Sequence, residues 1–598
     1  SLVGSEMCIR DRYVGKCIYY RRPAQLFYVE SLIFPNFVSL KRMNVEEYLN
    51  QLNESQREAV VYNEGPSLVV AGAGSGKTRV LTYKIAYLLQ LGLPPYSILA
   101  LTFTNKAARE MKERIARQVG AERARHLWMG TFHSIFLRIL HAEAAQIGFT
   151  PKFTVYDTAD SKSLLRSIIK EMGLDEKVYK PGTVQARISN AKNHLVSPAG
   201  YANNKEAYES DSAAKMPAIR DIYRRYWERC RQADAMDFDD LLFYTFLLFR
   251  DRPEVLARYR SQFRYILVDE YQDTNHVQYE IANLLAAKYQ NLMVVGDDDQ
   301  SIYSWRGADI TNILDFEQDF KNCKTVKLEQ NYRSTGHILS AANAVVRHNS
   351  QRKDKRLFTA EGDGEKIQAF QASDERDEGR WIAGEIEKLH SKGTSYDDIA
   401  VFYRTNAQSR ILEDMFLRAG VPYKIVGGTR FFDRAEIRDV MAYLKMIVNP
   451  ADEMSVKRVI NTPRRGIGST SIQKIEQLAR DNRCSFFQAC EIATAETGMF
   501  SAKVRNGLSS FVSLVREGRR MDGELKDVVE MIVDKTGLLQ AFRAEGTMES
   551  ESRAENIQEF LGVAAEFEET HEDIEGKLES LEELRAAGVA DVPEVAPM

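Results

Sequence analysis

The sequence predicts an α/β protein with two parallel sheets. Continuous apolar runs that end in glycine or a polar residue are typical of buried parallel strands, whose carboxyl-end loops carry function. Amphipathic helical stretches, such as residues 105–119, separate these runs. The first group of runs comprises residues 67–73, 97–103, 264–270 and 291–297, and the second comprises residues 324–330, 366–372, 399–405 and 423–428. We therefore expect two α/β units.

Length and composition agree with a globular protein of several domains. The chain has 598 residues, which is more than one hydrophobic core supports, and it is 44% hydrophobic and 28% charged. The net charge of −4 neither favours nor excludes nucleic acid, because a basic groove can lie on an acidic protein. The six cysteines form no CxxC pair, which favours a reduced cytoplasmic compartment over disulfides or zinc. No apolar run reaches membrane-spanning length, so we expect no membrane partner.

The order of these stretches also predicts domain boundaries. The first 42 residues are expected to be a non-native extension, because they open like read-through sequence and no signal cleavage site follows their apolar part. Met43 is the expected natural start. The expected segments are the extension 1–42, the first α/β unit in two parts (43–150 and 233–326), a helical insertion within it (151–232), the second α/β unit (327–448) and a helical insertion at 449–598.

A phosphate-binding loop follows the first predicted strand. The stretch AGAGSGKT, residues 71–78, leads from a strand into a helix, where backbone N–H groups can turn onto phosphates. Lys77 is expected to reach the β- and γ-phosphates, and Thr78 to hold Mg²⁺. A chance glycine-rich loop is the alternative, which the strand–loop–helix context disfavours. The predicted cradle is Ala71, Gly72, Ala73, Gly74, Ser75, Gly76, Lys77 and Thr78, with Ala71 in place of the usual first glycine.

Two adjacent carboxylates end another predicted strand, in ILVDEYQDTN (266–275). Asp269 suits Mg²⁺, directly or through water, and Glu270 is placed to polarise the water that attacks a γ-phosphate. An acidic strand cap is the alternative for the motif taken alone. Beside a phosphate loop, the pair predicts a nucleotide hydrolase with ATP and Mg²⁺ as cofactors.

Eight stretches in order resemble the motifs of the UvrD/PcrA/Rep helicases, over roughly residues 43–570. They are LNESQREAV (52–60), AGAGSGKT (71–78), LTFTNKAAREM (101–111), TFHS (131–134), DFDDLL (237–242), VDEYQDTN (268–275), VVGDDDQSIYSWRGA (294–308) and LEQNYRS (328–334). The resemblance implies two RecA-like P-loop motor units with two mainly helical inserted domains. It also implies ATP-driven 3′→5′ movement on single-stranded DNA, in DNA repair or replication.

The resemblance assigns further roles at the nucleotide. It implies that Gln56 reads the adenine edge, that Tyr332 stacks on the base and that Arg79 flanks it. Arg333 is expected to be an arginine finger on the γ-phosphate, an effect worth about 10³–10⁵ in rate in related systems. A surface salt bridge is the alternative for Arg333. The expected catalytic residues are Lys77, Asp269, Glu270, Gln300 and Arg333.

Single-stranded DNA is expected to cross the tops of both units. Phe103, Tyr303 and Trp305 are candidate stacking residues, each worth about 1–3 kcal/mol per base, with core packing as the alternative. Candidate contacts to the phosphate backbone are Thr102, Thr104, Asn105, His133 and Arg306. Arg404, Asn406 and Arg430 are as consistent with core or interdomain roles as with DNA binding.

Residues 462–475 resemble a helix-hairpin-helix element. Gly466 and Gly468 offer backbone N–H groups to a duplex phosphate, so the expected partner is a junction of single- and double-stranded DNA. The flanking Arg464 and Arg465 support this interpretation, and an ordinary helix–helix turn is the alternative. The protein is expected to be a monomer or a weak dimer.

The loop at residues 294–308 is expected to touch both ligands. Gln300 follows a strand beside Asp269 and Glu270, where it would sense the γ-phosphate or its attacking water. Tyr303 lies three residues later, so a shift at the phosphate should move the stacking residues. Asp297 suits the Mg²⁺ shell, whereas the sequence assigns no role to Asp298 and Asp299.

Two later motifs of the family, of the form TxHxAKGLE and RLxYVxxTRA, do not occur in residues 449–598. The expectation is therefore a carboxyl-terminal truncation, an incomplete second motor unit, poor ATP binding and little or no unwinding by this polypeptide. Two alternatives stay open. They are the helicase portion of a helicase–nuclease and a non-catalytic DNA-binding module that resembles an ATPase.

Overall fold

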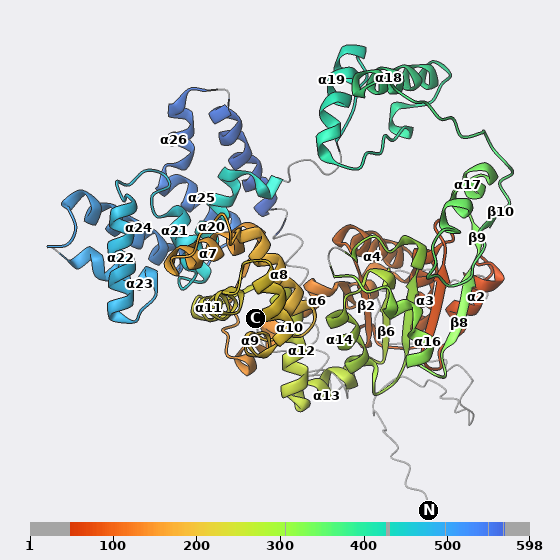
Figure 1. Ribbon diagram of the computed structural model, residues 1–598, viewed down its shortest axis with the longest axis horizontal. Helices are drawn as coiled ribbons and strands as arrows, with labels where there is room; N and C mark the ends of the chain where they lie inside the picture. Colours follow the sequence, from red (N-terminus) through yellow and green to blue (C-terminus); the bar gives the residue numbers. More distant parts are fainter. Residues whose placement is uncertain are drawn as a thin grey trace, which may run out of the picture.

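The computed structural model describes residues 48–304, 307–425, 431–496, 498–547, 549–565 and 567 (Figure 1). The predictions for the extension 1–42, for Trp305, Arg306 and Arg430, and for the side chain of Asn406 lie outside this description. In the described part, no helix is both long enough and apolar enough to cross a bilayer.

A six-stranded parallel sheet organises the first α/β unit, which confirms the predicted α/β class. The strands are β1 (Ser67–Ala71), β2 (Ile98–Thr102), β3 (Trp128–Thr131), β6 (Tyr265–Val268), β7 (Leu292–Gly296) and β8 (Lys324–Leu328). Their order across the sheet is β3-β2-β6-β7-β1-β8, and every neighbouring pair is parallel. All four runs of the first predicted group therefore form strands of one sheet.

The sheet is buried on both faces, since successive side chains of a strand point to opposite sides. In β1, Leu68 and Val70 join one apolar cluster, and Val69 and Ala71 join the other. The first cluster includes side chains of α6 (Phe132–Glu143), α12 (Phe238–Asp251), α13 (Pro253–Gln262) and α14 (His276–Ala286). The second includes side chains of α2 (Glu54–Val61), α3 (Lys77–Gln90) and α4 (Asn105–Val119). This two-sided burial explains the continuous apolar runs.

A mainly helical segment is inserted between α6 and α12. It comprises β4 (Thr154–Tyr156), α7 (Thr158–Glu171), α8 (Pro181–Asn193), α9 (Pro198–Asn203), α10 (Lys205–Ala213), α11 (Ile219–Gln232) and β5 (Ala235–Asp237), and β4 pairs with β5. The buried Lys192 on α8 lies 2.7 Å from Asp237 and 2.8 Å from Asp240, at the start of α12. These ion pairs fix the insertion to the first unit.

The second predicted strand group differs from the structure. The run at 324–330 supplies β8, which pairs with β1 at the edge of the first sheet rather than founding a second sheet. The runs at 366–372 and 399–405 are not strands, so that prediction is wrong. Within the described ranges they have no strand partner, and an isolated strand is not stable in water.

Residues 329–425 contain three helices and one small sheet. The elements are β9 (Gln330–Asn331), α17 (Gly336–Val346), β10 (Phe358–Thr359), α18 (Glu375–Ser391) and α19 (Ser409–Ala419), and β9 pairs with β10. In the predicted run at 423–428, residues 423–425 do not form a strand. Residues 426–428 lie outside the description.

The C-terminal part is helical. It comprises α20 (Ala435–Val448), α21 (Glu453–Val459), α22 (Ser469–Asn482), α23 (Phe486–Ala495), α24 (Ala502–Gly518), α25 (Leu525–Thr536), α26 (Leu538–Glu545) and a helical stretch at residues 549–565. Figure 1 shows α20 and α21 beside α7 of the first insertion, where Arg438 pairs with Asp157 at 2.9 Å.

Candidate active site

The predicted phosphate loop lies between β1 and α3. Gly74 and Gly76 have φ angles of 70° and 91°, a left-handed conformation that glycine adopts without steric cost. The Ser75 hydroxyl donates to the Gly72 carbonyl oxygen at 2.7 Å, which closes the turn. Gly76 is the N-cap of α3, so the loop presents the amino end of a helix to an anion.

Lys77 and the two carboxylates after β6 meet at this loop. The Lys77 ammonium lies 2.7 Å from Glu270 Oε2, and its side chain is only 11% exposed. Burial, together with the negative charge of Glu270, raises the pKa of Asp269 to about 7. Glu270 has a φ of 48°, which is uncommon for a residue with a Cβ and directs the chain sharply away from the strand. Three of the predicted catalytic side chains therefore occupy one corner.

The donor set at this corner fits Mg²⁺. Mg²⁺ in nucleotide sites takes one or two protein oxygen ligands and completes its shell with water and phosphate oxygens. The described residues contain no group of three or more histidine, cysteine or carboxylate side chains able to hold a metal alone. Asp269 is a buried carboxyl group whose pKa is raised by burial and by the charge of Glu270, so a cation beside it would favour its charged form, and Thr78 lies in the first turn of α3. These two residues are suited to a Mg²⁺ ion that binds together with the phosphates of a nucleotide.

The residues predicted to surround the base lie together on the other side of the loop. The buried Gln56 donates from its amide to the Ser75 carbonyl oxygen at 3.0 Å. Asn53 accepts from the Gln56 backbone N–H at 2.8 Å and donates to the Tyr332 hydroxyl at 2.7 Å. Arg79 donates to the Gln51 carbonyl oxygen at 2.7 Å. The phosphate loop thus connects α2 with the segment after β9.

Residues 331–333 also contact the phosphate loop directly. The Tyr332 backbone N–H donates to the Gly74 carbonyl oxygen at 2.9 Å, and Asn331 donates from its side chain to the Ala73 carbonyl oxygen at 2.6 Å. Arg333 is exposed, and its Cβ lies so close to Gly74 that a Cβ there would clash with it. The predicted arginine finger is therefore next to the loop that it would serve.

The loop after β7 is arranged differently from the prediction. The Gln300 amide donates to the Asp297 carboxylate rather than reaching the phosphate loop. Asp297 is occupied by Gln300 and by Lys355, at 3.0 Å, so it is not free to support a Mg²⁺ shell as predicted. Gln272 connects this loop to the catalytic corner, because its amide nitrogen donates to Glu270 at 2.9 Å and its oxygen accepts from the Asp297 backbone N–H at 2.9 Å.

A cavity of about 540 Å³ lies beside the carboxyl ends of β2 and β3. Thr102, Phe103 and His133 line it, as expected for residues predicted to contact DNA. The rings of Phe103 and Tyr303 are 4.9 Å apart with an interplanar angle of 33°. Burial lowers the pKa of His133 to about 4, so this side chain is neutral at pH 7.

The remaining predicted DNA contacts do not line this cavity. Thr104 is the N-cap of α4 and accepts from the Ala107 backbone N–H at 3.1 Å, and Asn105 is the exposed first residue of that helix. Gly466 has a φ of 77° and Gly468 is the N-cap of α22, as a tight turn between helices requires. Arg465 points inward and donates to the Tyr443 hydroxyl at 2.6 Å, so it stabilises this turn rather than flanking a phosphate.

Several cavity residues were not predicted from the sequence. They are polar side chains from the inserted helix α8, from the start of α12 and from the segment after β6: Ser189, Asn190, Asn193, Asp239, Asp273, Asn275 and Gln278. Asp239 belongs to the recognised motif DFDDLL, and Asp273 and Asn275 belong to VDEYQDTN, so these three residues could have been found from the sequence. Nothing in the sequence pattern of α8 marks its contribution.

Comparisons with known proteins agree with this geometry. Residues 52–321 match the model of the UvrD/REP helicase N-terminal domain, and residues 326–588 match that of the UvrD-like helicase C-terminal domain. The chain belongs to the UvrD-like helicase family. The predicted resemblance is confirmed, and with it the prediction of an enzyme of the helicase class.

Named relatives of this UvrD-like chain are similar over most of its length. It is 46% identical to a protein of Staphylococcus aureus (strain Mu50) over 526 residues, 87% of this chain and 70% of the relative. It is 47% identical to a protein of Bacillus subtilis (strain 168) over 531 residues, 88% of this chain and 71% of the relative. Both relatives are named ATP-dependent DNA helicase PcrA.

Proposed function

We propose that this UvrD-like protein is an ATP-dependent DNA helicase that moves 3′→5′ on single-stranded DNA in repair or replication. One observation carries the proposal. The chain segment from Asp297 to Tyr303 joins the catalytic corner, through Gln272 and Glu270, to the Phe103–Tyr303 ring pair at the cavity. A nucleotide and a nucleic acid bound at these places would contact the same short loop.

The chemistry at the catalytic corner follows from the ion pair there. The Lys77 ammonium lies 2.7 Å from Glu270 Oε2 and neutralises that carboxylate. When Lys77 turns to the β- and γ-phosphates, Glu270 is released to accept a proton from the attacking water. Thr78 and Asp269 would hold Mg²⁺, which would supply neutralising charge near the phosphates. Gln300 leaves Asp297 to orient the water, and Arg333 approaches the γ-phosphate from beside Gly74.

The cavity supports a partner with stacking bases and a phosphate backbone. Phe103 and Tyr303 provide ring faces, and stacking on such faces is indifferent to base identity. Thr102 and the neutral His133 offer uncharged groups beside them. We propose single-stranded DNA, adjoining a duplex, as this partner, and a monomer or weak dimer as the acting form.

We also propose that the protein acts in the cytoplasm. The four cysteines in the described ranges, Cys230, Cys323, Cys484 and Cys490, are all free thiols. Free thiols are normal in a reducing compartment.

Movement on single strands is the property to test. The runs at 366–372 and 399–405 have exposed apolar side chains, which supports the expectation that duplex unwinding by this chain is weak. The test therefore uses oligo(dT) blocked by streptavidin at one end, saturating ATP and Mg²⁺. A 3′→5′ motor displaces streptavidin from the 5′ end faster than from the 3′ end, and Lys77→Ala abolishes this displacement.

Two outcomes would contradict the proposal. Faster displacement from the 3′ end would reverse the direction. DNA binding without ATP-dependent displacement, equal in the wild type and Lys77→Ala, would instead identify a non-catalytic binding module.

A further inference from the structure

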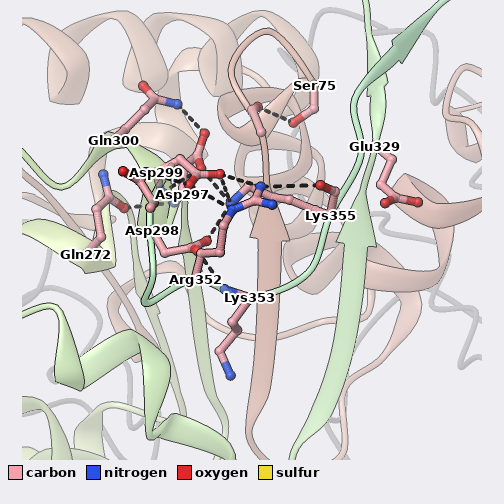
Figure 2. A network of polar contacts seen from close by, with 12 residues as sticks. Ser75, Gln272, Asp297, Asp298, Asp299, Gln300, Glu329, Arg352, Lys353 and Lys355 are labelled. Carbon is pink, nitrogen blue, oxygen red and sulfur yellow. Dashed lines mark hydrogen bonds and ion pairs between the residues drawn. The ribbon is translucent and has the colours of Figure 1, made fainter. Parts of the chain in front are cut away.

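A connector of nine residues, 349–357, leads from α17 to β10 and contacts both the phosphate loop and the loop after β7. At one end, Leu357 lies so close to Gly72 that a Cβ on Gly72 would overlap its side chain. Within the same connector, Arg352 and Lys355 bind the carboxylates of the loop after β7 (Figure 2). The connector thus contacts both the phosphate loop and the loop that leads to Tyr303.

Lys355 binds all three consecutive aspartates of the loop. Its ammonium lies 3.0 Å from Asp297, 2.5 Å from Asp298 and 2.9 Å from Asp299, and the whole residue is 5% exposed. Burial alone would lower the pKa of Lys355, but the carboxylates around it raise that pKa. Lys355 is therefore a charged lysine held at the centre of three acids.

Arg352 binds the same loop by a second, two-pronged contact. Its Nε and Nη2 donate to the two oxygens of Asp299 at 3.1 and 2.8 Å, a geometry that fixes orientation as well as distance. Burial would raise the pKa of Asp299, but hydrogen bonds from Arg352, Lys355 and Asn349 lower it to about 2. The two cations thus favour the charged form of Asp299.

The contact continues from Asp297 to the predicted phosphate sensor. One oxygen of Asp297 faces Lys355, at 3.0 Å, and the other accepts from the Gln300 amide. A movement of the connector therefore changes the group that holds Gln300, three residues before Tyr303. This route reaches the Asp297 carboxylate, whereas the route through Glu270 and Gln272 reaches the Asp297 backbone N–H.

We propose that Arg352 and Lys355 are positioning residues that couple the nucleotide to DNA, by tying the Asp297–Asp299 carboxylates to the connector that contacts Gly72. A nucleotide that moves the phosphate loop displaces Leu357, and the connector transmits this displacement to Gln300 and Tyr303. The inference rests on the proposed function, because it assumes that both ligands bind. It gives Asp298 and Asp299 the role that sequence reasoning left open.

The test measures thermodynamic linkage on the full chain. Fluorescence anisotropy of labelled oligo(dT) gives the DNA dissociation constant with and without a non-hydrolysable ATP analogue and Mg²⁺. The analogue is expected to change this constant about tenfold in the wild type, within the usual range of allosteric coupling. Lys355→Met should reduce the change to less than about twofold, with the nucleotide-free constant preserved.

Lys353→Met is the matched control. Lys353 belongs to the same connector, but its ammonium pairs with Glu317 at 2.5 Å and points away from the three aspartates (Figure 2). This variant should keep the wild-type linkage. An equal loss in Lys353→Met, or full linkage in Lys355→Met, would overturn the inference.

A second pair of variants decides the question if Lys355→Met does not fold. Arg352→Gln leaves Asp299 without its two-pronged partner and should weaken the linkage. In the double variant Arg352→Gln/Asp299→Asn, two neutral amide side chains face each other and neither carries an unpaired charge. This double variant should restore the linkage. No loss in Arg352→Gln, or no recovery in the double variant, contradicts the inference.

Failure of the inference and failure of the proposed function are distinguishable. A wild-type chain that displaces streptavidin but shows no linkage refutes the inference alone. A chain that does neither refutes the proposed function as well.

Discussion

The first parallel sheet and residues 329–425 have similar apolar runs but different structures. In the sheet, Leu292 and Val294 of β7 are fully buried between helices. In residues 329–425, Phe402 is 93% exposed and Ile367 is 60% exposed. The same pattern therefore produces a strand only where neighbouring strands and covering helices are present.

The difference also separates two kinds of site. The phosphate loop is shaped by one strand, one turn and one helix, so its geometry forms within the first sheet. Arg333 and the connector come from the later segment, and they approach the phosphate loop at Gly74 and Gly72, respectively. Under the proposed function, Lys77, Asp269 and Glu270 of the first sheet would carry the hydrolysis chemistry, and the later segment would add Arg333 to it.

The largest expected effect comes from replacing Glu270, the proposed general base in the first unit. Glu270→Gln should lower the ATP hydrolysis rate by about 10²–10⁴, because general-base catalysis contributes that much. ATP binding should survive, since Lys77 and the phosphate loop are intact. Steady-state hydrolysis and nucleotide titration check both points. Glu387→Gln, an exposed position on α18, is the matched control and should change neither.

A core substitution compares the two regions in stability. Leu292→Ala should lower the free energy of unfolding by about 2–5 kcal/mol, because it leaves a cavity in a packed core. Phe402→Ser should change it by less than about 0.5 kcal/mol, because the side chain is already exposed. Urea unfolding measures both. Equal losses would mean that the two regions are packed alike.

A third comparison concerns the pH dependence of folding stability in the absence of Mg²⁺. The pKa of Asp269 is raised from its ordinary 3.8 to about 7, so its charged form is disfavoured in the folded chain. Folded stability should therefore fall as pH rises from about 4 to 7. Asp269→Asn should remove this component of the slope in urea unfolding. An identical pH dependence of stability in the variant would contradict a buried Asp269 carboxyl group with a raised pKa.

The sequence predicted the features that local rules determine. The strand–loop–helix around Gly74 and Gly76 requires left-handed glycines, and the carboxylates Asp269 and Glu270 end a continuous apolar strand. Such signals are contained in a few neighbouring residues. These local signals predict the catalytic corner without knowledge of any tertiary contact.

Features that depend on distant segments were not predictable in the same way. Lys355 lies more than fifty residues from the aspartates that it binds, and no spacing rule connects them. Asn193 lines the cavity from an inserted helix, and β8 joins the first sheet because β1 leaves that edge open. These outcomes are decided by packing rather than by periodicity.

If nucleotide and DNA act through one loop, ATP hydrolysis measured with and without oligo(dT) reports their coupling. We expect DNA to raise the wild-type rate, and Tyr303→Ala to lose most of this increase while keeping the DNA-free rate. A wild-type rate that is the same with and without saturating DNA would contradict this expectation.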